Sequence, residues 1–160
     1  MIDLYPNQIV IVARATPADS AVYVWGHKVQ GIRAIWASGS SKSTLLDISI
    51  NLTTIPVPAP PVDAVELYPD QLTLDLRGTP SAPQVARIFH GNRQLALVDG
   101  FDFILNSEGP STEVILRWFP GMSPEALADL SPETRETHLE TLRGLATLPW
   151  VQVHSPLKVP

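Results

Sequence analysis

A block of eleven residues that occurs twice is the feature that most constrains how this chain folds. Residues 4–14 read LYPNQIVIVAR, and residues 67–77 read LYPDQLTLDLR. When residues 2–17 are aligned with 65–80, seven of sixteen positions are identical, whereas average residue usage gives roughly one identity by chance. The likeness continues more weakly to DISINL (47–52) and EVILRW (113–118), at an offset three residues longer. We therefore expect an internal duplication.

Each copy has the pattern of β-structure. In LTLDL (72–76), leucines alternate with Thr73 and Asp75, as in a half-buried strand. Four such strands per copy, separated by turn residues, predict a mainly β fold of tandem four-stranded units, sandwich or Ig-like in type. The expected organisation is a first β unit (1–57), a proline-rich linker (58–64), a second β unit (65–122) and a C-terminal region (123–160). Both separate domains and one pseudo-symmetric sandwich fit this pattern.

The two copies differ in the outward positions of their first strand. Thr73 and Asp75 in the second copy suit water, whereas Val10 and Val12 stand at the same places in the first copy. A strand that is apolar on both faces is normally covered on both. We therefore expect Val10 and Val12 to lie under the other copy, the C-terminal helices or another subunit.

The C-terminal region predicts a helical hairpin and an extended tail. Ser123-Pro124 and Ser131-Pro132 are typical helix starts, with serine as the N-cap and proline in the first turn. We expect helices over about 124–130 and 132–143, the second ended by Gly144 in a left-handed conformation. WVQVH (150–154) predicts a last strand, added either to a sheet edge or to a neighbouring molecule.

Composition excludes several functions. The net charge is −5, which argues against nucleic-acid binding, because that requires a basic face. Cysteine is absent, so thiolate chemistry and disulfides are excluded. No apolar run reaches the ~18 residues of a membrane helix, and the N-terminus lacks the pattern of a secretory signal. We expect a chain made in the cytosol that binds no membrane.

The candidate chemical motifs are incomplete. SGSSKST (38–44) lacks the glycines of a phosphate-binding loop. His27 and His90 occupy similar turns in the two copies and would suit a metal if the copies met there, but no further ligand has a matching spacing. We therefore predict no catalytic residue, no cofactor and no metal. The tryptophans and tyrosines fit either core packing or a sugar-stacking platform.

Two stretches carry a resemblance to known families. VYVWGHKVQGIRAI (22–35) resembles the short β units of small bacteriophage virion proteins, such as head-decoration and tail-associated proteins. The LYPxQ opening, with GTP following in the second copy, is similar to the first strands of bacterial and phage Ig-like modules. The resemblance implies a non-enzymatic structural protein of the virion, a capsid decoration (cement) or minor head–tail component. Its partners would be other virion proteins and a second copy of itself.

The expected contact surface consists of apolar residues from the β units and from the tail. Its residues are Val10, Val12, Ile115, Trp150, Val151, Val153 and Leu157. An alternative that the sequence also allows is an Ig-like carbohydrate-binding or adhesion module that uses exposed aromatic side chains.

Overall fold

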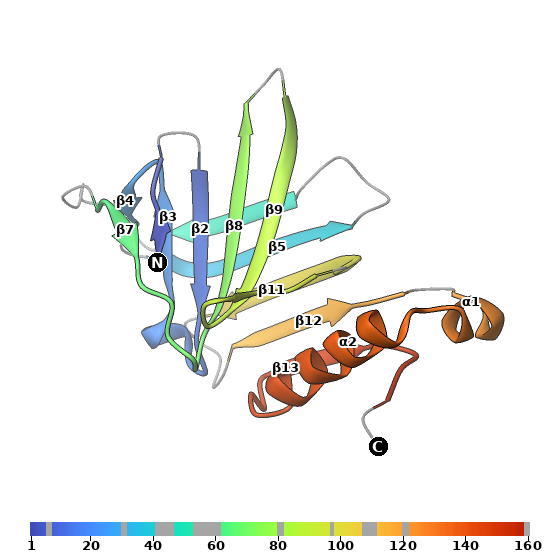
Figure 1. Cartoon of the computed structure of the whole chain (residues 1–160). Helices are drawn as coiled ribbons and strands as arrows, with labels where there is room; N and C mark the ends of the chain where they lie inside the picture. The colour runs from blue at the N-terminus through green and yellow to red at the C-terminus, as the bar shows by residue number, and fades with distance from the viewer. Residues whose placement is uncertain are drawn as a thin grey trace.

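The computed structural model of the chain is mainly β, with two α-helices near the C-terminus among the residues that it describes (Figure 1). The described residues are 1–5, 8–29, 32–40, 47–52, 62–79, 82–96, 98–106, 112–119 and 122–158. The expected linker and the SGSSKST loop therefore fall mostly outside the described residues. No helix within these ranges is long and apolar enough to cross a membrane.

Six antiparallel strands form the larger sheet, in the order β10-β9-β8-β2-β3-β4. The strands are β2 (Gln8–Ala13), β3 (Ala21–Val24), β4 (His27–Lys28), β8 (Leu72–Thr79), β9 (Ala82–His90) and β10 (Arg93–Gln94). A short 3-10 helix, Pro17–Asp19, lies in the connection between β2 and β3. The two strands that carry the repeated block, β2 and β8, are neighbours at the centre of this sheet.

A second sheet has five strands in the order β13-β12-β11-β5-β6. The strands are β5 (Ile32–Ser40), β6 (Asp47–Leu52), β11 (Gly100–Asn106), β12 (Glu113–Arg117) and β13 (Val151–His154). All pairs are antiparallel except β12 with β13, which run parallel. The expected last strand does join a sheet edge, as β13. A third, two-stranded ribbon pairs β1 (Ile2–Asp3) with β7 (Ala64–Val65).

Every sheet contains strands from both repeated stretches. Where the two stretches meet, one pair in each sheet joins residues that hold the same position in the alignment: Ile2 with Val65, Ile11 with Leu74, and Ala37 with Phe103. Backbone hydrogen bonds recur in the same way. Trp25 N donates to Gln8 O (3.0 Å), and Gly91 N donates to Gln71 O (3.1 Å). The stretches therefore share their sheets rather than forming one sheet each.

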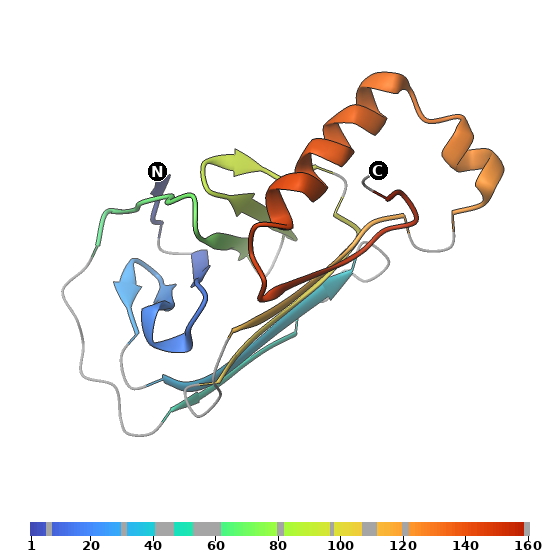
Figure 2. The same cartoon turned by 90° about the horizontal axis from the view of Figure 1, so that it is seen from below.

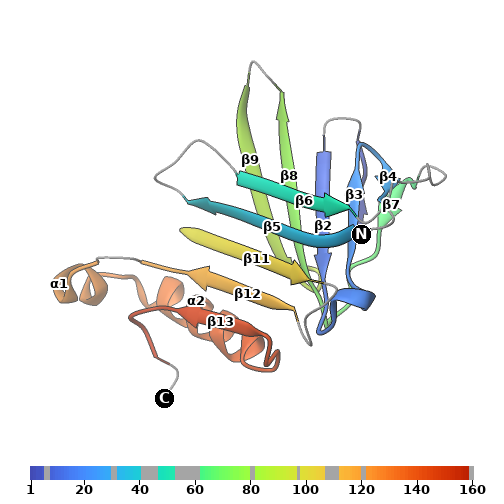
Figure 3. The same cartoon turned by 180° about the vertical axis from the view of Figure 1, so that it is seen from behind.

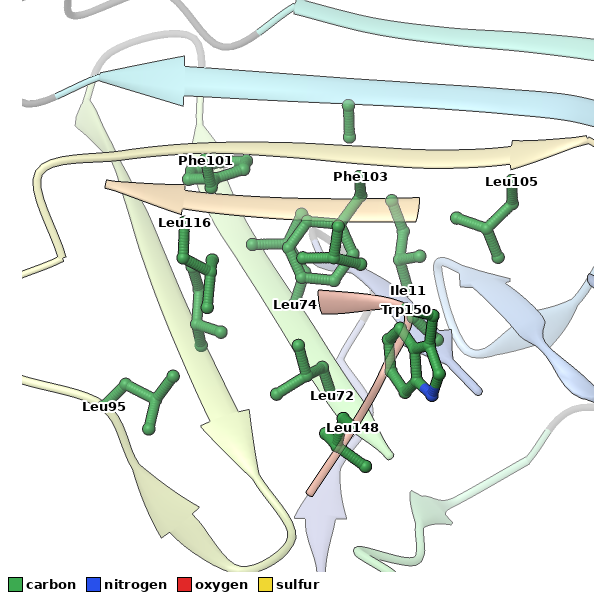
Figure 4. Packing of buried hydrophobic residues seen from close by; sticks show 14 of the residues in the cluster. Ile11, Leu72, Leu74, Leu95, Phe101, Phe103, Leu105, Leu116, Leu148 and Trp150 are labelled. Carbon is green, nitrogen blue, oxygen red and sulfur yellow. The ribbon is translucent and has the colours of Figure 1, made fainter. Parts of the chain in front are cut away.

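The main hydrophobic core lies between the two larger sheets, whose strands cross (Figures 2 and 4). Inward-facing residues of both sheets meet there, and Phe103, Leu74 and Leu116 are fully buried. The helix α2 (Pro132–Leu145) closes one end of this core through Leu142 and Leu145. The layered arrangement leaves the far face of the five-stranded sheet uncovered by any other described element (Figure 2).

The helices begin where the sequence predicts. The hydroxyl oxygen of Ser123 accepts from Ala126 N at the start of α1 (Pro124–Ala128), and that of Ser131 accepts from Thr134 N at the start of α2. The expectation for Gly144 was wrong, because α2 continues to Leu145 and Gly144 has no left-handed conformation. Instead, a Cβ at Gly144 would lie 3.4 Å from the ring of His90. This is an ordinary van der Waals distance, and it places α2 beside the end of β9.

Candidate protein-contact surfaces

Val10 and Val12 are covered, but by the chain itself. Val10 is 0% exposed and Val12 is 6% exposed, and both pack with Val65 of the β1–β7 ribbon and with Leu4. The ribbon therefore lies over the face of the six-stranded sheet that points away from the main core. The expectation that this face is covered is confirmed. The expectation that the two valines contact a partner is not met, since neither is accessible in the folded chain.

Thr73 and Asp75 do not face water, contrary to the sequence prediction, and both are 0% exposed. The Asp75 carboxylate is held by side chains on both neighbouring strands. Gln8 Nε2 donates to its Oδ1 (2.6 Å), and Arg87 Nε donates to its Oδ2 (3.0 Å), with a second bond from Arg87 Nη2. A buried carboxylate is tolerated when a guanidinium pairs with it and further hydrogen bonds satisfy it.

The tyrosine, glutamine and arginine side chains of the repeated block form contacts between the two stretches. The Arg14 guanidinium lies 5.0 Å from the ring centroid of Tyr68, and the Arg77 guanidinium lies 5.0 Å from that of Tyr5. Each arginine thus stacks on the tyrosine of the other stretch, a favourable cation–π contact. Gln71 Oε1 accepts weakly from Arg14, at 3.4 Å. The repeated block is therefore a packing element.

No other described element covers the far face of the five-stranded sheet (Figure 3), and apolar side chains on it are exposed or half-buried. We call it the outer sheet face and define it by Trp36, Asp102, Ile104, Ile115 and Arg117. Trp36 is 58% exposed and lies opposite Ile104 on β11, while Asp102 lies opposite Ile115 on β12. The flanking residues on β5 and β11 are buried in the main core, so strand alternation turns these five outward. Arg117 Nη2 and Asp102 Oδ2 form an ion pair at 2.7 Å.

The predicted contact residues do not come together. Ile115 lies half-buried on the outer sheet face, and Trp150 is buried in the main core. Val151, Val153 and Leu157 line an apolar groove of about 250 Å³ between α2 and the C-terminal segment. The sequence prediction did not single out Trp36 as an exposed residue of the outer sheet face, although the alternation of IRAIWAS around Ile35 and Ala37 carried the signal.

A second hollow lies beside the β1–β7 ribbon and is called here the ribbon cavity. It has a volume of about 340 Å³, and its lining includes Val12, Arg14, Ala21, Tyr23, Glu66 and Tyr68. Cationic, anionic, aromatic and small apolar side chains therefore meet in one place. The apolar floor comes from β2 and β3, and Glu66 directly follows β7.

The histidines do not form the pair that the sequence suggested. His27 pairs with Val24 across the β3–β4 turn, whereas His90 pairs with Arg93, so His90 takes the place of Val24 and not that of His27. No group of three or more metal-ligating side chains occurs within the described ranges. His138 is buried against Trp118 and Phe119, and this burial lowers the pKa of its imidazole.

Comparison with models of known protein families, with curated protein sequences and with solved structures finds no match for this chain.

Proposed function

We propose that this chain is a non-enzymatic structural protein of a bacteriophage particle, a capsid decoration or minor virion protein that works through protein–protein contacts. The observation that carries the proposal is the outer sheet face. A tryptophan that is more than half exposed, with Ile104 directly opposite it on the neighbouring strand, is costly to leave in water. Tryptophan and arginine are also the residues that most often dominate protein interfaces.

The partner in this proposal is a capsid or tail subunit with a matching apolar surface. The Asp102–Arg117 pair beside Trp36 gives the outer sheet face one charge of each sign, which would fix the orientation of a partner. Repeated copies of the chain on a particle would each use the same face. No chemistry is required of the chain in this role.

The proposal includes an origin by duplication of one β unit. Two strand orders support this origin, β10-β9-β8-β2-β3-β4 and β12-β11-β5-β6. When each strand is replaced by its counterpart in the alignment, the result is the same order in reverse. The central pairs Ile11–Leu74 and Ala37–Phe103 join counterpart residues. This arrangement supports a pseudo-twofold relation in which the two units are packed as a fused dimer.

The test is assembly of the purified chain onto particles of the virus that encodes it. Trp36→Thr removes the exposed indole while keeping a good strand residue. Trp25→Asn is the matched control, because Trp25 is 66% exposed at the β3–β4 turn, in the other sheet. Co-sedimentation should fall at least tenfold for Trp36→Thr and stay unchanged for Trp25→Asn, with equal melting temperatures. A wild-type chain that never sediments with particles would overturn the proposal.

A second function, carbohydrate binding through exposed aromatics, is favoured by one observation. Trp25 holds a positive φ of 52°, which is rare for a bulky residue, and it presents its indole at the tip of a turn. Such a side chain suits stacking on a sugar ring. Quenching of tryptophan fluorescence by oligosaccharides, abolished by Trp25→Asn and retained by Trp36→Thr, would favour this function over the first.

A further inference from the structure

The ribbon cavity contains a position where the first stretch has a small residue and the second stretch has a large one. On the face under the ribbon, Val12 of β2 lies directly opposite Ala21 of β3. At the counterpart position in the alignment, Asp75 of β8 lies directly opposite Arg87 of β9. The same cross-strand site therefore holds Val–Ala in one stretch and Asp–Arg in the other. Ala21 lines the ribbon cavity.

In the second stretch, an arginine side chain of the protein itself stands at the equivalent position. The Arg87 side chain is about one-third exposed and reaches the Asp75 carboxylate, and its guanidinium lies 5.2 Å from the ring centroid of Phe89. The counterpart of Phe89 in the first stretch is Tyr23, which also lines the cavity. A tyrosine face attracts a cation in the same way as a phenylalanine face.

We propose that the ribbon cavity receives an arginine side chain from a partner protein. The methylene stem would lie along Val12 and Ala21, and the planar guanidinium would stack on Tyr23. Glu66 is one of the lining residues, and its carboxylate would pair with the guanidinium, in the role that Asp75 has for Arg87. This site is separate from the outer sheet face, and the inference does not depend on the virion proposal.

The cationic lining residue Arg14 is compatible with this occupant. Its guanidinium is turned to Gln71 Oε1 and to the Tyr68 ring. Its counterpart Arg77 lies close to Arg87, since Arg77 Nε is 3.5 Å from the same Asp75 oxygen that Arg87 binds. Two arginines are thus accommodated side by side in the second stretch. Lys28, the other cation of the lining, is exposed and paired with Tyr23 across the β3–β4 hairpin.

The test is a titration of the isotope-labelled full chain with N-acetyl-L-arginine amide, followed by amide chemical shifts. We expect saturable shifts confined to the cavity, at residues such as Ala21, Tyr23 and Glu66. The neutral citrulline analogue, which has nearly the same shape, should bind at least tenfold more weakly. Equal shifts with both probes, shifts spread over the surface, or preferential binding of N-acetyl-aspartate amide would overturn the proposal.

Two variants locate the site. Ala21→Arg places an arginine inside the cavity and should abolish the shifts. Because that variant carries a folding risk, the exposed Glu66→Gln provides a second route, and it should weaken binding at least threefold at an unchanged melting temperature. The control is Glu113→Gln, an exposed carboxylate on β12 in the other sheet, which should leave the titration unchanged. Unaltered binding in Glu66→Gln would contradict the assigned role of its carboxylate.

Discussion

At the scale of single residues, the difference between the two stretches is concentrated in one cross-strand pair. Val12–Ala21 and Asp75–Arg87 occupy the same register in the same sheet. A carboxylate at position 12 alone would lack a counterpart of Arg87, and the Arg14 guanidinium in the same lining is already turned to Gln71 and Tyr68. A carboxylate and an arginine introduced together would recreate a pair that the chain already contains.

We therefore expect Val12→Asp to lower the free energy of unfolding by about 3–5 kcal/mol, as removal of a buried charge's partner does. The double variant Val12→Asp/Ala21→Arg should recover more than half of that loss. Urea unfolding of the wild type, both single variants and the double variant gives the coupling energy directly. Additive effects would mean that the two sites differ in shape and that the proposed twofold relation does not extend to this face.

His138 supplies a residue-scale prediction on pH. Its ring is packed between Trp118 and Phe119, with Nε2 2.8 Å from the hydroxyl of Ser155. Burial lowers the pKa of His138 below its ordinary value of 6.5, so the unfolded chain binds this proton more readily than the folded chain. The stability contributed by neutral His138 is complete above that ordinary value and is lost as the pH falls below it.

The melting temperature should accordingly decrease between pH 8 and pH 5. In a His138→Gln variant the decrease should be smaller, because the titrating group is gone. A variant that keeps the full pH dependence would show that other groups cause it. His154→Gln, which changes an exposed histidine on the neighbouring strand β13, is the matched control and should behave as the wild type does.

At the scale of elements, the sequence correctly predicted features that depend on neighbouring residues, such as helix starts. Serine caps fixed the starts of both helices, and WVQVH was correctly expected to form a strand, which joins a sheet edge. The prediction failed for Thr73 and Asp75 because strand alternation cannot reveal a cross-strand arginine that neutralises a buried carboxylate. It failed for Gly144 because a glycine near the end of a helix does not by itself impose a left-handed conformation, and α2 continues to Leu145.

The contribution of helix α2 to stability should come from a few buried leucines rather than from the residues of its polar surface. Leu145 is 1% exposed within the main core, whereas Glu136 on the same helix forms only an exposed ion pair with Arg143. Leu145→Ala should destabilise the fold by about 2–5 kcal/mol through the cavity that it leaves. Glu136→Ala, the control, should cost less than about 1 kcal/mol. Chemical unfolding measures both, and equal losses would mean that α2 is not anchored through the core.

At the scale of the whole molecule, the two stretches are expected to unfold as one unit. The central pairs β2–β8 and β5–β11 join them in both large sheets. The sequence predicted a mainly β chain and the likeness of its halves, but it could not tell whether the halves stand apart. That choice depends on which strand edges pair, and both arrangements place the same residues on the same strand faces.

Fragments 1–57 and 58–160 should therefore each fail to fold alone and should assemble when co-expressed. Each would otherwise expose the edge of a central strand and half of the main core. Circular dichroism of the separate and mixed fragments, and a single thermal transition for the intact chain, check this expectation. A fragment that folds as a stable monomer would show that the halves are independent domains.

The contrast between Ala21 and Arg87 has a consequence for assembly. A symmetric dimer of two identical chains has every binding site twice, so its two ends are equivalent. In the fused pair that we propose, Arg87 occupies one arginine site from within the chain, while the counterpart site in the ribbon cavity is open to a partner. Such a molecule can bind a single partner arginine and thereby distinguish one of its ends from the other, which gives polarity to anything built from it.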